Sequence, residues 1–521
     1  MKYSAMKQFG NWFSKNKNLY LFLLCLLILD RIALLVNFNF RYVGSDDMIF
    51  WQSATDYMNG VFHEPYFYGQ NYNFMLESIF AAPFLSLGVP YTFIFPICTS
   101  IMSLFPFVYF SVILFRRGFE IEGIFFIIIP LLLPIEYGML TSITRGFISG
   151  LFFTAFLATP LLNPTKKISW LIAAFALSLG YISNPNSLIF SLPLCLYLFL
   201  NNFKQFSFYL INLIAIIPVL LIEYFSKQFY IENMEFRVNS MWKLDFSFEM
   251  LLNDFNQLDK FFGYFMPVIW PAGWIIIVIL LLSGLKLFKM DFKKGFSLLF
   301  AVFFILISLG INKVNDNIGT IFLSSTRMYL GIPLLTGLAF FWCKKMIKLQ
   351  DNNLKAIILI VSVAVFFCKL NVYPAVIGMH KNKNNQNMPI KNISELKCEC
   401  AKLDSIANKE NIDLIIFVYD SLYNIPYLEF YNYGCPLLEK KIPKTMMNLY
   451  EKRTWVYLTE KSSIEPNILI FNYKIDSNQI NMFPKLIMLS GIHNLTLINE
   501  NKIRTDSLLK KLKIQLARNT Y

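Results

Sequence analysis

Charged side chains are scarce in this sequence. Aspartate, glutamate, lysine and arginine together supply 15% of its 521 residues, whereas about 25% is usual in a soluble domain. Hydrophobic residues supply 56% and aromatic residues 17%, and the mean hydropathy is +0.50. A soluble fold of this length cannot hide so much apolar surface. The composition therefore excludes a soluble globular protein and indicates a chain that is solvated largely by lipid.

Histidine is also scarce, because the whole chain holds only 3, and no metal cluster of the usual kind can be assembled from them. The sequence therefore supports no cofactor, and it leaves dependence on a divalent metal open. The sequence lacks a glycine-rich phosphate loop and a dinucleotide fingerprint. The net charge is +14, but the lysines lie in short loops rather than in a basic module interleaved with aromatic residues. Nucleic acid is therefore not an expected partner.

Long apolar runs dominate the first 371 residues. A membrane-spanning helix needs about 20 such residues, and somewhat shorter runs can span when neighbours bury their ends. We predict eleven spans, at 19–36, 91–115, 121–140, 146–162, 168–183, 186–200, 206–225, 267–285, 295–311, 328–342 and 354–371. The first follows a lysine-rich start without a small-residue cleavage site, which favours an uncleaved span.

Basic residues in the loops predict the orientation of these spans. If the N-terminus is cytoplasmic, five Lys/Arg-rich loops also fall inside, as the positive-inside rule requires. These loops lie at 116–117, 166–167, 204, 286–294 and 344–348. The loop 37–90 and the tail then lie outside. Residues 74–88 are apolar but short, and a span there would invert every later loop, so we expect a helix in the outer interface.

The tail, residues 372–521, has a different character. Four short runs rich in β-branched and aromatic residues predict strands. They are Ile412–Asp420, Trp455–Thr459, Ile468–Tyr473 and Leu486–Leu489. A helix capped by Asn392 is expected over 393–410 and another over 507–518, after a polar linker at 380–388. The predicted fold is mostly α, with a polytopic membrane domain over 1–371 and a small extracytoplasmic α/β domain over 372–521.

Three cysteines lie in this tail, Cys398, Cys400 and Cys435. In an oxidising compartment one pair of them is expected to form a disulfide, and the third is left over. Spacing alone does not choose the pair.

The predicted spans and the charges of their loops together indicate a multi-pass protein of a bacterial inner membrane, with a cytoplasmic N-terminus and a periplasmic or extracellular tail.

The first outer loop, 37–90, carries the most distinctive pattern. An acidic pair, Asp46-Asp47, follows the first span, with Trp51, Ala54 and Asn59-Gly60 after it. Further along stand Tyr68-Gly69-Gln70, Tyr72, Leu76-Glu77, Ala81-Ala82 and Leu87-Gly88. This order resembles the first loop of the GT-C glycosyltransferases, in particular the branch of the protein O-mannosyltransferases and the lipid A aminoarabinose transferase. Weaker similarities occur at 144–146, 184–188 and 325–333.

The resemblance implies a transferase that takes a sugar from a polyprenyl-phosphate carrier and passes it to a lipid, glycan or protein hydroxyl. Such a transfer needs a base near the attacking oxygen. The resemblance places this role on Asp46, with Asp47 orienting it or contacting the acceptor. The non-catalytic alternative is that both acids are solvated charges in the loop that ends the span. The absence of a nucleotide fingerprint fits a lipid-linked donor.

Fixed cations are needed where the phosphate leaves. Arg145 and Arg327 are candidates, because each lies at the outer mouth of a predicted span, although lone arginines there more often reach for lipid headgroups. Arg237 and Lys243 are further candidates in the loop 226–266.

Other first-loop side chains are candidate ligands of the substrate. Glu77 starts the expected interfacial helix, and Tyr68 and Gln70 belong to the Tyr-Gly-Gln element. The same residues also suit an interfacial aromatic belt. His63 is a candidate for binding the acceptor, and a metal role for it is not favoured.

Four ionisable residues fall within or near the spans. Adjacent helix residues do not face each other, so we expect Asp30 and Arg31 to find partners on other helices. We expect Glu136 and Glu223 to be exposed at the interface.

Two other functions compete with glycosyl transfer. A transporter or lipid flippase usually places polar residues at the bilayer midplane and often carries internal repeats. No repeat is visible, and the ionisable residues gather at the outer mouths of the spans. A non-catalytic scaffold would tolerate replacement of Asp46 and Asp47.

Overall fold

The structure is a computed structural model of the chain. It describes the residues 16–68, 72–233, 245–266, 272–315, 321, 325–347, 349–384, 390–418, 428–439, 444–448, 467–471, 485–487 and 495–499. These residues belong to two compact units. The first unit comprises Met1–Phe40, Pro96–Glu223 and Trp242–Lys383, and the second comprises Arg41–Phe95, Tyr224–Met241 and Asn384–Tyr521. The first outer loop and the tail, which are far apart in the sequence, thus belong to the same unit.

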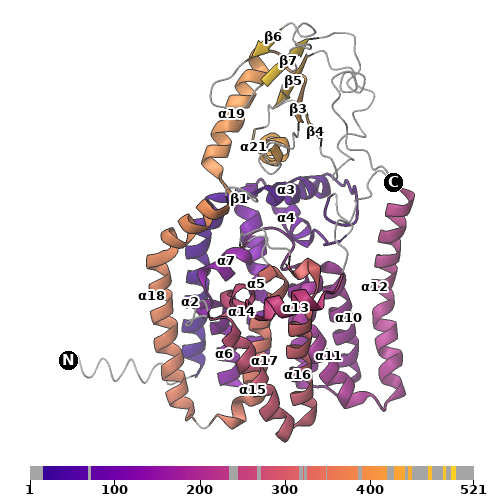
Figure 1. Cartoon of the computed structure of the whole chain (residues 1–521), viewed down its shortest axis with the longest axis vertical. Coiled ribbons are helices and arrows are strands. Elements are labelled where there is room, and N and C mark those ends of the chain that lie inside the picture. The colour runs from indigo at the N-terminus through magenta and orange to yellow at the C-terminus, as the bar shows by residue number, and fades with distance from the viewer. Residues whose placement is uncertain are drawn as a thin grey trace, which may run out of the picture. The chain divides into compact units, whose positions relative to one another are not determined.

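The first unit is a bundle of apolar helices (Figure 1). Its longer helices are α2 (Asn16–Leu34), α5 (Tyr91–Arg116), α6 (Glu120–Leu132), α10 (Lys167–Ser183), α11 (Leu188–Asn202), α12 (Phe206–Glu232), α15 (Trp274–Met290), α16 (Phe292–Ser308), α17 (Ile332–Cys343) and α18 (Asp351–Asn384). Helices α15 and α16 pack along each other, and α11 and α17 pack beside them. Their buried faces form one large apolar core, which includes Phe126, Phe190 and Leu335.

Short helices complete this unit where the chain changes direction. They are η1 (Leu35–Asn39), α7 (Ile135–Leu140), α8 (Ser149–Thr154), η2 (Ala155–Leu157), α9 (Ala158–Leu162), η3 (Pro185–Ser187), α13 (Phe248–Phe255), α14 (Leu258–Phe262), η5 (Gly263–Phe265), η6 (Asn312–Asn315), η7 (Ser325–Tyr329) and η8 (Lys344–Met346). Helices α13 and α14 lie in the loop 226–266, for which the sequence predicted no helix. Pro134 caps α7 and separates it from α6, because proline cannot continue a helical hydrogen-bond ladder.

Within the described residues, every predicted span coincides largely with helix, although the run 121–140 is divided into α6 and α7 and the run 146–162 into three short helices. The first part of the predicted span 267–285, residues 267–271, lies outside the described residues. Among the described residues, four helices are long and apolar enough to cross a membrane: Asn16–Asn39, Tyr91–Arg116, Phe206–Glu232 and Asp351–Lys381. The membrane character is therefore supported, while the number of spans stays a prediction. The prediction of a polar linker at 380–388 is wrong for residues 380–384, because α18 continues to Asn384.

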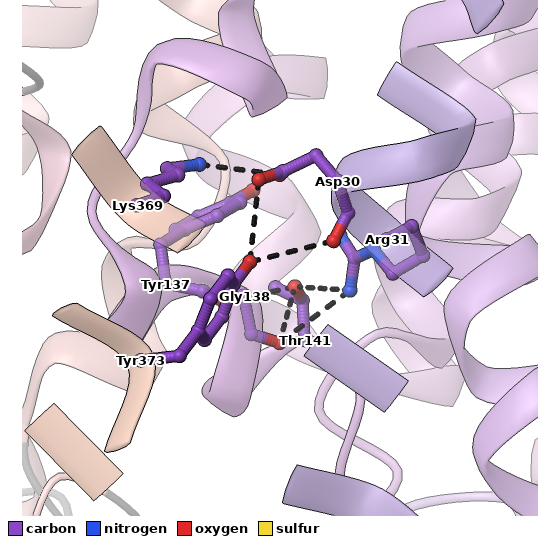
Figure 2. A network of polar contacts seen from close by, with 7 residues as sticks. All are labelled: Asp30, Arg31, Tyr137, Gly138, Thr141, Lys369 and Tyr373. Atoms are coloured by element: carbon purple, nitrogen blue, oxygen red, sulfur yellow. Dashed lines mark hydrogen bonds and ion pairs between the residues drawn. The ribbon is translucent and has the colours of Figure 1, made fainter. Parts of the chain in front are cut away.

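A buried polar network joins the first and the last of these four helices (Figure 2). The ammonium of Lys369 on α18 lies 3.2 Å from a carboxylate oxygen of Asp30 on α2. The hydroxyl of Tyr373 donates to the other oxygen at 3.2 Å. Arg31 turns instead toward α7, where its guanidinium lies 3.4 Å from the Gly138 carbonyl and 3.5 Å from the Thr141 hydroxyl. The prediction that Asp30 and Arg31 each find partners on other helices is thus confirmed.

The position of Glu136 contradicts the prediction of interfacial exposure. Its side chain is not exposed at an interface but buried, and it lies 3.3 Å from the imidazole of His380 on α18. A buried carboxylate needs a polar partner because burial removes its water, and α18 supplies one at this level. Glu223 on α12 is half-buried.

The second unit contains the first outer loop and the tail. Strand β1 (Tyr42–Gly44) leads directly into α3 (Ser45–Met58), and α4 (Leu76–Ser86) packs against α3. The helix predicted in the segment 74–88 is therefore present. Strand β1 pairs antiparallel with β2 (Ile390–Asn392), with Val43 opposite Lys391. This small sheet joins the first loop to the start of the tail, a pairing that the sequence did not predict.

The tail forms a five-stranded sheet in the order β4-β3-β5-β7-β6. Its strands are β3 (Leu414–Val418), β4 (Lys444–Asn448), β5 (Asn467–Phe471), β6 (Lys485–Ile487) and β7 (Leu495–Asn499). Strand β3 is parallel to β4 and β5, and β7 is antiparallel to β5 and β6. The helix expected over 393–410 is α19 (Ile393–Lys409), and Asn392 caps it by accepting from the Ser394 N–H. The predicted strand 455–459 and helix 507–518 lie outside the described residues.

A disulfide joins Cys400 on α19 to Cys435, the first residue of α21 (Cys435–Leu438). The sequence left the pair open among three cysteines, and the structure selects Cys400 and Cys435. Cys398 is exposed with a free thiol. A stable disulfide is typical of a periplasmic or extracellular compartment, which agrees with the predicted location of the tail.

This location can be tested by labelling single cysteines. In a background without other cysteines, Cys398 is expected to react with a membrane-impermeant maleimide on intact cells. A cysteine introduced by Lys289→Cys, at the exposed end of α15, is expected to react only after the membrane is permeabilised. Labelling of Cys398 only after permeabilisation would reverse the predicted topology.

Candidate functional site

The acidic pair lies in the first turn of α3. Gly44 precedes the helix, and its backbone N–H donates to the carboxylate of Asp47, the third residue of the helix. Asp47 is buried and Asp46 is half-buried. The positive end of the helix dipole favours negative charge at this place. Asp47 therefore stabilises the start of α3, and Asp46 is the more exposed of the two carboxylates.

Helix α4 fixes the other side of α3. The Ser53 hydroxyl donates to the Ser78 hydroxyl at 2.6 Å, and the Ser78 hydroxyl donates to the Phe50 carbonyl at 2.9 Å. Small hydroxyl side chains at the contact allow the two helices to approach closely. Glu77 stands next to Ser78 in the first turn of α4 and is fully buried. Glu77 is therefore withdrawn from solvent in the first turn of α4.

A third carboxylate, Asp56, organises the loop that follows α3. One of its oxygens accepts from the Tyr68 hydroxyl at 2.8 Å, and the other accepts from the Gln52 amide at 3.0 Å. The imidazole of His63 lies 3.6 Å from the carboxylate. Burial raises the pKa of Asp56, and the hydrogen bond from Tyr68, the charge of His63 and the hydrogen bond from Gln52 offset part of this rise. The Tyr68 hydroxyl is thus already bonded to Asp56.

Glu64 anchors the same loop at a second point. It is fully buried, and its carboxylate accepts from the Tyr230 hydroxyl at 3.0 Å. The ring of Tyr66 stacks on Phe74, with 4.9 Å between ring centroids, and on Tyr230 at 6.1 Å. Two buried carboxylates and an aromatic stack therefore hold the described parts of this loop, residues 60–68 and 72–75, in place. Neither Asp56 nor Glu64 was a predicted site residue, although Asp56 stands four residues after Gln52, a spacing at which helical side chains meet.

The pKa of Asp56 leads to a pH-dependent prediction. Because the folded protein binds this proton more tightly than the unfolded chain, the stability that Asp56 contributes is greatest when it is protonated, below about pH 4. It is lost as the pH rises through the folded pKa. We expect the melting temperature of the wild type minus that of Asp56→Asn to be highest at acid pH and to fall toward neutral pH. A difference independent of pH would contradict the buried state of Asp56.

The two candidate arginines belong to the first unit, where three segments converge. The turn after α7 contains Arg145, which is buried, and Gly146, whose φ of +69° suits glycine. The Asn184 amide donates to the Gly146 carbonyl at 3.1 Å. The Asn186 amide donates to the carbonyls of Phe147 at 2.7 Å and Arg327 at 3.2 Å.

The side chain of Arg327 completes this cluster. Its guanidinium carbon lies 5.3 Å from the centre of the Phe147 ring, within the range of a cation–π contact. The segments 144–146, 184–188 and 325–333, which the sequence singled out separately, are thus brought together through two asparagine side chains. We call this set, Arg145, Gly146, Phe147, Asn184, Asn186 and Arg327, the arginine platform.

The candidate residues therefore fall into two sets. Asp46, Asp47, His63, Tyr68 and Glu77 belong to the second unit, and Arg145 and Arg327 belong to the first. Gln70 lies outside the described residues, as do Arg237 and Lys243. Among the described residues, no group of three or more His, Cys, Asp and Glu side chains is arranged to hold a metal ion.

Comparisons with known proteins identify the fold. Neither the models of known protein families nor the curated protein sequences give a match. Among solved structures, ArnT from Cupriavidus metallidurans in the apo state is similar, with a TM-score of 0.55 and 9% identity over 91% of this chain and 97% of that chain. ArnT from the same organism bound to undecaprenyl phosphate gives a TM-score of 0.51 and 10% identity, with the same coverage. At this identity the likeness shows the fold alone, and that shared fold agrees with the one that the first-loop resemblance implied.

Proposed function

We propose that this chain is a membrane glycosyltransferase that transfers a sugar from a polyprenyl-phosphate donor to a hydroxyl on the outer face of the membrane. The observation that carries the proposal is the shared fold with ArnT over 91% of the chain, including a form of ArnT bound to undecaprenyl phosphate. A fold alone does not specify a reaction. The acidic first turn of α3 and the arginine platform add the chemistry.

In the proposed reaction, Asp46 is the general base. It takes the proton of the acceptor hydroxyl while the oxygen of that hydroxyl forms a bond to the anomeric carbon. The bond from this carbon to the phosphate breaks, and its electron pair leaves with the polyprenyl phosphate. Attack opposite to the leaving group inverts the anomeric centre. Asp47 keeps the first turn of α3 in place, and Glu77, His63, Tyr68 and Gln70 are proposed to contact the sugar or the acceptor.

Arg145 and Arg327 are proposed to bind the phosphate of the carrier. A guanidinium offers paired N–H donors that match phosphate oxygens. The carbonyls around the two arginines are held by Asn184 and Asn186, so the platform is organised before a ligand binds. Because these groups are already ordered, less conformational entropy is lost when a phosphate binds.

Transfer can be tested with the purified full-length protein in liposomes and a panel of polyprenyl-phosphate hexoses and pentoses. We expect at least one donor to release free polyprenyl phosphate and to place its sugar on a hydroxyl acceptor. Movement of the donor between leaflets without release would favour the flippase instead. No release from any donor, together with no binding of undecaprenyl phosphate, would contradict the proposal.

A further inference from the structure

The C-terminal domain contacts α3 close to its acidic first turn. The residues Phe430–Gly434 form the short helix η9, which packs against α3 within the second unit. A Cβ atom built on Gly434 would lie 2.9 Å from the sulfur of Met48, and Met48 is fully buried. Met48 follows Asp47 directly in α3. Gly434 therefore allows η9 to approach the helix that carries both acids.

Helix η9 is held from the side of the sheet as well. The Thr445 hydroxyl on β4 donates to the Asn432 carbonyl at 2.9 Å. The ring of Tyr431 packs on Phe471 of β5, with 5.3 Å between centroids. Because close-packed interiors transmit displacement rather than absorb it, a shift of η9 relative to the sheet would be felt at Met48.

A covalent bond fixes η9 at its C-terminal end. Cys435 follows Gly434 directly and forms the disulfide with Cys400 on α19. Lys391 adds a polar link, because its ammonium pairs with Glu399 of α19 and donates to the Tyr431 hydroxyl at 2.9 Å. Lys391 lies on β2, whose partner strand β1 ends at Gly44, immediately before α3. Two connections from α19 thus converge on α3, one through β2 and one through the disulfide.

We propose that the C-terminal domain is a positioning part of the transferase, in which Gly434 and the Cys400–Cys435 disulfide hold α3 in the place from which Asp46 acts. The inference rests on the proposed function, because losing these contacts is expected to slow the sugar-transfer step. Loss of the disulfide lets η9 move, and α3 then moves with it. Small misplacements of a reacting group cost about tenfold to a hundredfold in rate.

The first test reduces the folded protein in liposomes. A water-soluble phosphine takes oxygen from water and leaves Cys400 and Cys435 as two thiols, and Cys398→Ser is the control for the free thiol. We expect kcat for sugar transfer to fall about tenfold to a hundredfold, with little change in the KM for the donor. The variant Cys400→Ser/Cys435→Ser is expected to have the same low kcat and to be insensitive to the phosphine.

The second test separates positioning from general stability. Gly434→Ala is expected to lower kcat because its methyl group meets Met48, and Gly434→Ala/Met48→Ala is expected to regain most of the loss. The melting temperature of Gly434→Ala is measured beside its kcat, because relief of overpacking can also restore stability. A lower kcat at an unchanged melting temperature supports positioning, and a fall in kcat that only follows the melting temperature contradicts it.

Hydrogen exchange reports on α3 without requiring sugar transfer, so its result does not depend on the proposed function. After reduction, hydrogen exchange of the α3 amides at 45–58 is expected to speed up, while that of α16 at 292–308 stays unchanged. Faster exchange in a protein that transfers no sugar would support the coupling and contradict the function. Unchanged exchange of α3 and unchanged kcat after complete reduction would overturn the inference.

Discussion

Replacing Asp46 by asparagine is expected to lower sugar transfer by about a hundredfold to ten-thousandfold, the usual contribution of a general base. Asparagine has nearly the same shape but cannot take up a proton at neutral pH. Asp46 is half-buried in the first turn of α3, so the substitution should leave the fold intact. Binding of undecaprenyl phosphate by the variant is expected to stay close to that of the wild type.

Two matched variants make this result specific. Glu249→Gln changes an exposed acid in the first turn of α13, and we expect no effect on transfer. Asp47→Asn weakens the bond to the Gly44 N–H, and we expect it to lower the melting temperature as well as the rate. Equal and full activity of wild type and Asp46→Asn, measured as release of polyprenyl phosphate, would remove Asp46 from the role of base.

The second large effect is expected in the buried network between α2 and α18. Asp30→Asn leaves the ammonium of Lys369 buried without its carboxylate. Removing one member of a buried ion pair typically costs about 3–5 kcal/mol. Lys369 is bonded to Asp30, and the charges of Arg31 and Glu136 also act on it. We therefore expect a lower free energy of unfolding in detergent, and a loss of folded protein on mild heating.

Removing both charges tests this explanation. Asp30→Asn/Lys369→Met is expected to regain most of the lost stability, because no unpaired charge then stays buried. Asp351→Asn is the control, since it breaks the exposed pair with Lys344, which is worth about 1 kcal/mol or less. Equal effects of Asp30→Asn and Asp351→Asn would show that the network contributes little. A transporter or flippase would instead need these charges for transport, and the double variant would then be stable but inactive.

The helices of the membrane unit were predictable because lipid allows few alternatives. Apolar runs must satisfy their backbone hydrogen bonds internally, so the runs 91–115 and 206–225 had to form helices and did. Their lengths were less predictable. The polar residues 380–384 extend α18, because His380 reaches the buried Glu136, a partner that lies 244 residues away in the sequence.

The candidate site was predictable only in part. The acidic pair stands out in the sequence because it follows a span directly, and it lies in the first turn of α3. The role of Asp56 was not, because it depends on Tyr68 folding back from the loop. The contact of η9 with α3 was not predictable either, since it depends on a small side chain at Gly434 meeting a residue nearly 400 positions earlier. Such pairings arise from tertiary packing rather than from local patterns.

The pairing of β1 with β2 also orders events during synthesis. Val43 leaves the ribosome long before its partner Lys391, and at about 5–20 residues per second the delay is roughly 20–70 s. In the predicted topology the first loop has already crossed the membrane during this interval, and β1 still lacks its partner strand. The segment that carries Asp46 is thus among the last to reach its final pairing.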